Sequence, residues 1–228
     1  MQRQIVKEFD FDSLADSYDR WYESAVGQMY DKLEKRVFDI LLKDEPTSGQ
    51  LLEVGCGTGH WSKYFSEKGY EIIGIDTSEQ MVNAARRKNI PDCFFQVADG
   101  QDIPFDDNSF DGAASITTLE FAEDPQKVIS EMARSVKPGG KLFFGVLNSL
   151  SPYNRKRQKI KNSLYEQAEL FSPEQLSNLL AGFGKVRTEV AGFVPQNQSL
   201  IWMAPVLEIL YRSVNSKKGA FIAAEVRL

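Results

Sequence analysis

The stretch LLEVGCGTGHW at residues 51–61 determines how the rest of the chain is interpreted. A short apolar run leads into Gly55, Gly57 and Gly59, and a helix is expected to begin near His60. Glycines are needed where a backbone turns sharply and approaches a ligand without a Cβ in the way. The N-terminus of a following helix presents unpaired N–H groups to a polar ligand. The stretch therefore predicts a strand, a ligand-binding turn and a helix, in that order.

A carboxylate follows the next predicted strand. Asp76 lies 21 residues after Gly55, at the end of the apolar run 71–75. In a strand–helix–strand unit, this spacing brings the carboxylate beside the glycine turn, where it can accept hydrogen bonds from a ribose diol. The glycines are spaced G-x-G-x-G, unlike the G-x-G-x-x-G of dinucleotide sites, and no Lys follows them as in phosphate-binding loops. Glu53, two residues before the first glycine, suits a ligand with positive charge. These features favour a cationic nucleoside without phosphate.

Short apolar runs alternate with helix-spaced segments along the chain. Strands are expected at 51–54, 71–75, 93–97, 110–115, 141–147, 185–191 and 219–227, and helices at 60–68, 78–88, 125–136, 175–181 and 204–213. Strands that alternate with helices predict an α/β fold with a parallel sheet covered on both faces. We expect one domain over 1–228, with a helical cap at 1–48, a cofactor-binding core at 49–147 and a substrate-side segment with the C-terminal strands at 148–228.

The N-terminal part of the chain is expected to be helical and rich in aromatic residues, and a break precedes the first strand. The aromatic residues are Phe9, Phe11, Tyr18, Trp21, Tyr22 and Tyr30, and the break is formed by Pro46, Thr47, Ser48 and Gly49. A second irregular region follows residue 147. Its basic run, RKRQKIK at 155–161, is expected to form a solvated helical face; a lid that attracts an anionic substrate is the alternative.

Composition excludes several classes of protein. The net charge of −5 argues against a nucleic-acid binder with a broad basic face. The chain has one His, and its two Cys residues lack the spacing of a metal-ligand pair, so no metal site is predicted. No run approaches about 20 apolar residues, so no stable membrane insertion is expected. Sparse Cys usage suits a reducing interior, and the predicted location is cytoplasmic.

The ordered motifs resemble those of the class I S-adenosylmethionine-dependent methyltransferases. EVGCGTG at 53–59 resembles the first motif, and the resemblance implies that the backbone of Gly55, Cys56 and Gly57 supports the methionine part of the cofactor, with Glu53 nearby. GIDTSEQMV at 74–82 resembles the second motif, with Asp76 at the ribose and with Thr77 and Met81 near the adenine.

Three further motifs follow in the order typical of the family. VADGQDIPFDDNSFD at 97–111 implies that Asp99 accepts from the adenine amino group and that Gly100 donates its backbone N–H. SITTLEFAEDP at 115–125 resembles the segment that lines the reaction cavity and implies that Thr117 contacts the cofactor. SVKPGGKLFF at 135–144 resembles the turn into the fifth strand. The family implies a Rossmann-like, mostly parallel seven-stranded sheet with helices on both faces and an antiparallel last strand.

YDRWY at 18–22 resembles the N-terminal segment of family members that methylate quinones, sterols and similar small metabolites. In that subgroup the segment folds over the cofactor, which implies that Tyr18 lies near the methionine end, with a cation–π or hydrogen-bond role at the sulfonium. The region 148–170 shows no substrate-specific signature, so the methyl acceptor and its reacting atom stay open, as does the oligomeric state.

Methyl transfer from a sulfonium is an in-line displacement, with S-adenosylhomocysteine as the product. The cofactor carries the reactive group, so the protein mainly binds, orients and desolvates. A general base helps where the acceptor is a hydroxyl or an acidic carbon; Glu120 is the first candidate for that role and His60 the second. Two alternatives remain: a non-catalytic binder of the same cofactor and a nicotinamide-dependent oxidoreductase.

Overall fold

The computed structural model describes residues 10–43, 48–195 and 197–228. Phe9 of the predicted aromatic segment, and Pro46 and Thr47 of the predicted break, lie outside the described residues.

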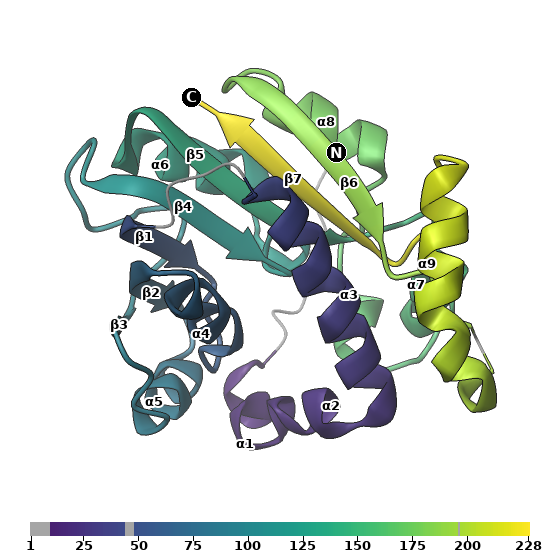
Figure 1. Cartoon of the computed structure of the whole chain (residues 1–228). Helices are drawn as coiled ribbons and strands as arrows, with labels where there is room; N and C mark the ends of the chain where they lie inside the picture. Colours follow the sequence, from purple (N-terminus) through teal and green to yellow (C-terminus); the bar gives the residue numbers. More distant parts are fainter. Residues whose placement is uncertain (1–9, 44–47, 196) are drawn as a thin grey trace, which may run out of the picture.

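One seven-stranded sheet organises the chain, in the order β3-β2-β1-β4-β5-β7-β6 (Figure 1). Its strands are β1 (Gly49–Val54), β2 (Tyr70–Asp76), β3 (Cys93–Val97), β4 (Phe110–Ile116), β5 (Val136–Leu147), β6 (Lys185–Ala191) and β7 (Phe221–Arg227). The first five strands pair in parallel, and β7 runs antiparallel to both β5 and β6. The order reverses at β1 and β4, and ligands bind beyond the carboxyl ends of strands at such a point. The predicted fold class is confirmed.

Helices cover both faces of the sheet. On one face lie α3 (Ala25–Leu41) and α4 (His60–Glu67), and on the other lie α6 (Pro125–Ser135) and α8 (Pro173–Leu180); α5 (Glu79–Arg87) packs on β2 and β3. Side chains of a strand alternate between faces. Leu51 therefore joins the α3–α4 core, whereas its neighbour Leu52 joins the α6–α8 core. Both leucines are fully buried.

The prediction for the fifth strand was wrong at its start. The sequence places a turn at residues 138–140 and a strand from 141, but β5 is extended from Val136 and α6 ends one residue earlier than expected. The register with β4 is irregular between Phe110, which pairs with Val136, and Gly112, which pairs with Lys141. Such a bulge absorbs extra residues within an extended strand, so the proline and two glycines do not have to form a tight turn.

Short helices lie beyond the carboxyl ends of the central strands. Below the sheet in Figure 1 are α1 (Ala15–Tyr18) and α2 (Arg20–Glu23), preceded by the 3₁₀ turn η1 (Asp12–Leu14). The other short elements are η2 (Leu119–Phe121), α7 (Pro152–Gln158), η3 (Leu164–Glu166), η4 (Gln198–Met203) and α9 (Ala204–Ser213). Within the described ranges, every helix is too short or too polar to span a bilayer.

Candidate functional site

The glycine loop and the end of β2 are joined by hydrogen bonds. The Gly57 N–H donates to Asp76 Oδ2 over 2.8 Å, and the Ser78 N–H donates to Oδ1 of the same carboxylate over 2.9 Å. The N–H groups of Gly55 and Cys56 both donate to the Ile75 carbonyl. Burial raises the pKa of Asp76, and the two backbone donors oppose that shift. The carboxylate thus lies against the loop, as the residue spacing predicts.

The two glycines that open the loop have different surroundings. A Cβ at Gly55 would lie 2.2 Å from Thr118 Oγ1, so the absence of a side chain allows the loop to pack against the residues after β4. A Cβ at Gly57 would meet nothing within 4 Å, although its φ of +51° is left-handed. The open face at Gly57, beside the Asp76 carboxylate, fits a ligand that carries hydroxyl groups and lies close to backbone.

Thr117 follows the last residue of β4 and has an unusual backbone conformation. Its φ of +52° lies in the left-handed region, which is unfavourable for a β-branched residue. Its N–H donates to the Gly145 carbonyl over 2.6 Å, which holds the conformation in place. Strain of this kind is concentrated at ligand-binding sites, and Thr117 is one of the residues that the sequence singled out.

Residues 10–23 form the part of the predicted helical cap that precedes α3, and from here on they alone are called the cap. They are hydrogen-bonded to the glycine loop after β1 and to the residues after β2. Ser78 Oγ–H donates to Asp12 Oδ1 over 2.5 Å, and Thr58 Oγ1–H donates to Asp19 Oδ1 over 2.7 Å. Lys88 Nζ lies 2.6 Å from the other oxygen of Asp19. Sequence reasoning missed Asp12 and Asp19, because their partners are 66 and 39 residues away in the chain.

Two tyrosines of the cap face the site. Burial raises the pKa of Tyr18, while hydrogen bonding to the side chains of Thr117 and Tyr22 acts in the opposite direction. The Tyr22 ring stacks on His60 with 3.6 Å between centroids and an interplanar angle of 12°. His60 Nε2 lies 2.7 Å from Asp31 Oδ1. His60 therefore anchors the cap to the start of α4.

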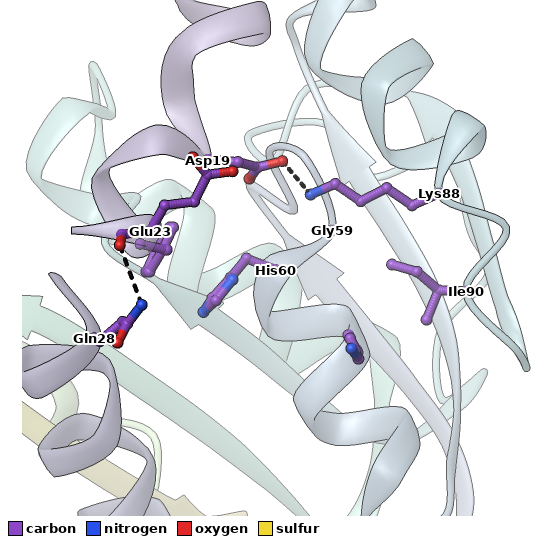
Figure 2. A pocket seen from close by; sticks show the side chains of 9 residues that line it. Asp19, Glu23, Gln28, Gly59, His60, Lys88 and Ile90 are labelled. Carbon is purple, nitrogen blue, oxygen red and sulfur yellow. Dashed lines mark hydrogen bonds and ion pairs between the residues drawn. The ribbon is translucent and has the colours of Figure 1, made fainter. Parts of the chain in front are cut away.

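An open cavity of about 400 Å³ lies beside this anchor. Figure 2 shows Lys88 reaching toward Asp19 at one side of the cavity and His60 on the same wall as Gly59. The cavity is lined by Asp19, Tyr22, Glu23, Gln28, Gly59, His60, Lys63, Lys88 and Ile90. None of the predicted cofactor-binding residues is in that set.

The predicted adenine-side residues follow the carboxyl ends of β2 and β3. Thr77 and Asp99 are exposed, whereas Met81 is buried at the start of α5. Asp99 Oδ1 accepts the Gln101 N–H over 2.8 Å, which leaves the other carboxylate oxygen without a bond among the described residues. A Cβ at Gly100 would lie 2.5 Å from a methyl of Val54, so a glycine is required for this segment to pack against β1.

Glu53 and Cys56 lie on the buried side of the loop. Ser62 Oγ–H donates to Glu53 Oε2 over 2.5 Å, and burial raises the pKa of Glu53 to about 8. Burial also raises the pKa of the Cys56 thiol well above its ordinary value. Cys56 is consequently a poor nucleophile, because the thiolate is the reactive form. Cys56 and Cys93 are both free.

Two further carboxyls are buried beside the cap. Glu120 lies in η2, just past the end of β4, and its Oε1 accepts the Leu147 N–H over 2.5 Å. Its Oε2 has no partner within the described ranges, and burial raises its pKa to about 8. Glu34 of α3 is also buried, with a pKa raised to about 8 by burial. Sequence analysis missed Glu34, although helical spacing places this acid on one face with Tyr30 and Val37, which are buried too.

Metal ligation finds no support in the part of the chain that the structure describes. No group of three or more His, Cys, Asp or Glu side chains there could hold a metal ion.

A methyltransferase-domain model matches residues 52–144, which include the glycine loop, Asp76 and the strands through β5. With the strand order and the antiparallel β7, this match defines the class. The chain belongs to the class I S-adenosylmethionine-dependent methyltransferases, so it is an enzyme and S-adenosylmethionine is its cofactor. The two alternatives, a non-catalytic binder and a nicotinamide-dependent oxidoreductase, are set aside.

Similar proteins include enzymes with different acceptors. An uncharacterised protein of Methanocaldococcus jannaschii is 34% identical over 178 residues, covering 76% of this chain and 80% of that protein. The malonyl-[acyl-carrier protein] O-methyltransferase of Enterobacter lignolyticus is 30% identical, covering 68% of this chain and 62% of that enzyme, less than two thirds of its length. A Thermotoga maritima structure described as a possible histamine N-methyltransferase superposes with a TM-score of 0.75 at 24% identity, covering 95% and 97% of the two chains.

Proposed function

We propose that this enzyme transfers the methyl group of S-adenosylmethionine to a small-molecule acceptor. The observation that carries the proposal is the Asp76 carboxylate held against the open face of Gly57. In this arrangement Asp76 accepts from the ribose hydroxyls, and Thr77, Met81, Asp99 and Gly100 enclose the adenine. The backbone of Gly55, Cys56 and Gly57 supports the methionine part, and Glu53 stabilises the loop from behind through Ser62.

Catalysis rests on positioning and on exclusion of water. The cofactor supplies an activated methyl group, and the protein has to align an acceptor with it. Alignment alone provides about 7–11 kcal/mol in well-oriented reactions. Tyr18, at the end of α1, lies close to Thr117, the residue after β4, and we place the sulfonium there. The cap bonds from Asp12 and Asp19 keep bulk water from that point.

Glu120 is our candidate general base. With a pKa of about 8 it is largely protonated at pH 7, so it accepts a proton from the acceptor only in its ionised fraction. A base contributes about 100- to 10,000-fold where the acceptor is a hydroxyl or acidic carbon. The rate of methyl transfer to such an acceptor would rise with pH through about 8 and level off above it, as Glu120 ionises.

We assign residues 49–147 to the cofactor and the segments 1–48 and 148–228 to the acceptor, all within a single domain. The cytoplasm is the proposed location, because a reducing compartment suits the free thiols of Cys56 and Cys93.

The experiment combines binding and turnover. S-Adenosylhomocysteine at 100 times its dissociation constant stabilises a protein by about 2.7 kcal/mol, which raises the melting temperature of a chain of this size by roughly 5–10 °C. Transfer of a labelled methyl group to acceptors in metabolite extracts then identifies the product. Absence of any stabilisation by S-adenosylhomocysteine, alongside stabilisation by NAD, would contradict the proposal.

A further inference from the structure

Arg157 differs from the other cations of the basic run 155–161. The sequence predicted a solvated helical face, and this is wrong at Arg157. Arg155 and Lys156 are exposed, and the helix α7 ends at Gln158, but Arg157 turns inward and is half-buried. The prediction failed because this stretch lacks an apolar stripe that would show which side of the helix faces the protein.

Aromatic rings surround the Arg157 guanidinium. Its central carbon lies 3.4 Å from the ring centroid of Tyr165, 5.1 Å from that of Tyr153 and 5.9 Å from that of Trp21. Contact with the Tyr165 ring fixes the guanidinium without using its N–H donors. Tyr153 in turn stacks on Tyr30 of α3, with 4.9 Å between centroids, which holds α7 against the first long helix.

No carboxylate among the described residues forms an ion pair with Arg157. Arg134 and Arg212, by contrast, lie 2.8 Å from glutamate oxygens. Burial lowers the pKa of Arg157, and Glu34 counteracts that effect only from beyond ion-pair distance. A desolvated cation without a counter-ion is unfavourable, and an anion that binds beside it removes the penalty.

The guanidinium belongs to the acceptor side of the site. Trp21, whose ring centroid lies 5.9 Å from the central carbon of the guanidinium, belongs to the cap, and Tyr153 connects Arg157 to Tyr30 of α3. Tyr18, Tyr30 and Glu34 also influence the pKa of Arg157. Glu34 has a pKa of about 8, so at pH 7 it is mostly neutral and repels an incoming anion little. The same side also holds the buried Glu120, whose pKa is raised to about 8 as well.

We propose that Arg157 recognises an anionic group, a carboxylate or a phosphate, on the methyl acceptor. This inference rests on the proposed function, because it identifies the substrate class of that same site. The planar guanidinium presents its N–H donors as a fork that matches either group. The exposed cations Arg155, Lys156, Lys159 and Lys161 attract anions toward this side of the protein.

The test uses paired probes that differ in charge. Benzoate and phenyl phosphate are titrated by calorimetry against the full-length protein, with benzamide and phenol as neutral partners, in the presence and absence of S-adenosylhomocysteine. We expect the anions to bind, and Arg157→Gln to weaken them by about tenfold or more, as for a hydrogen bond to a charged group. Arg157→Lys keeps the charge but not the fork, and we expect intermediate affinity. Lys156→Gln makes the same charge change on the exposed side of α7 and serves as the matched control.

Each outcome decides between the two proposals. If the anions bind wild type and Arg157→Gln equally, or Lys156→Gln weakens them as much, the Arg157 assignment is overturned. Failure of both anions to bind the wild type while S-adenosylhomocysteine binds overturns it as well and leaves the methyltransferase proposal intact. If the wild type does not bind S-adenosylhomocysteine at all, the result counts against the proposed function instead. Circular dichroism of Arg157→Gln, together with its unchanged affinity for S-adenosylhomocysteine, shows that the variant is folded.

Discussion

The carboxylate of Asp76 is the most informative group to remove. In Asp76→Ala the N–H groups of Gly57 and Ser78 lose their acceptor, and the proposed bonds to the ribose are lost with it. A hydrogen bond to a charged group contributes about 1.5–3 kcal/mol, and each 1.4 kcal/mol is a factor of about ten in affinity. We therefore expect S-adenosylhomocysteine to bind about 10- to 150-fold more weakly in a calorimetric titration.

A comparison of ligands separates loss of the ribose bonds from damage to the loop. The wild type should prefer S-adenosylhomocysteine over its 2′,3′-dideoxy analogue, and Asp76→Ala should bind both with similar affinity. A distorted loop alone would weaken both ligands equally and preserve the preference. Asp106→Ala, which removes an exposed carboxylate outside the site, is the matched control. An unchanged affinity for S-adenosylhomocysteine in Asp76→Ala would refute the ribose assignment.

Four further variants test neighbouring parts of the site. Gly55→Ala places a Cβ 2.2 Å from Thr118 Oγ1 and should lower the melting temperature far more than Gly57→Ala, whose Cβ meets no neighbour. Gly57→Ala should instead weaken cofactor binding. A larger loss of melting temperature in Gly57→Ala than in Gly55→Ala would contradict the loop geometry. Glu53 holds a proton in the folded protein up to a pKa of about 8, so wild-type stability falls as pH rises from about 4.5 toward 8, where the unfolded chain has already released that proton. Glu53→Gln should show a smaller fall in urea midpoints between pH 5 and 9; an identical pH profile would exclude this titration. Asp12→Ala removes the acceptor of the Ser78 hydrogen bond and should increase the rate of cofactor release, measured by stopped-flow displacement. An unchanged release rate would mean that the cap does not cover the cofactor.

The sheet could be predicted because each strand is recognisable from the residues next to one another in the sequence. Leu51 and Leu52 lie in an apolar run, and the alternation of strands with helices requires a parallel sheet. The irregular start of β5 was not predicted, since its extended form depends on the register with β4. Gly49 was predicted in the break, but it is the first residue of β1, where it pairs with Tyr70. The contact of the glycine loop with Asp76 was predictable, because both lie in one strand–helix–strand unit.

Residues whose role depends on distant partners were not predictable in the same way. His60 was considered as a second base, but it is held by Asp31 and Tyr22 of the N-terminal helices. Arg157 looked like a solvated cation, because nothing in its own helix indicates Tyr165 or Trp21. Such contacts arise from tertiary packing, which a local pattern does not contain.

The cap has a consequence for the order in which the protein folds. It is the first described part of the chain, yet Asp12 bonds to Ser78 and the Phe11 ring packs at 5.3 Å from that of Phe121. These partners do not exist until β2 and β4 have formed, and contacts between residues far apart in the sequence form slowly. A nascent chain therefore exposes Phe11 until Phe121 has been synthesised. This segment completes its contacts only after the central strands have formed, and it is also the segment that local unfolding should release first.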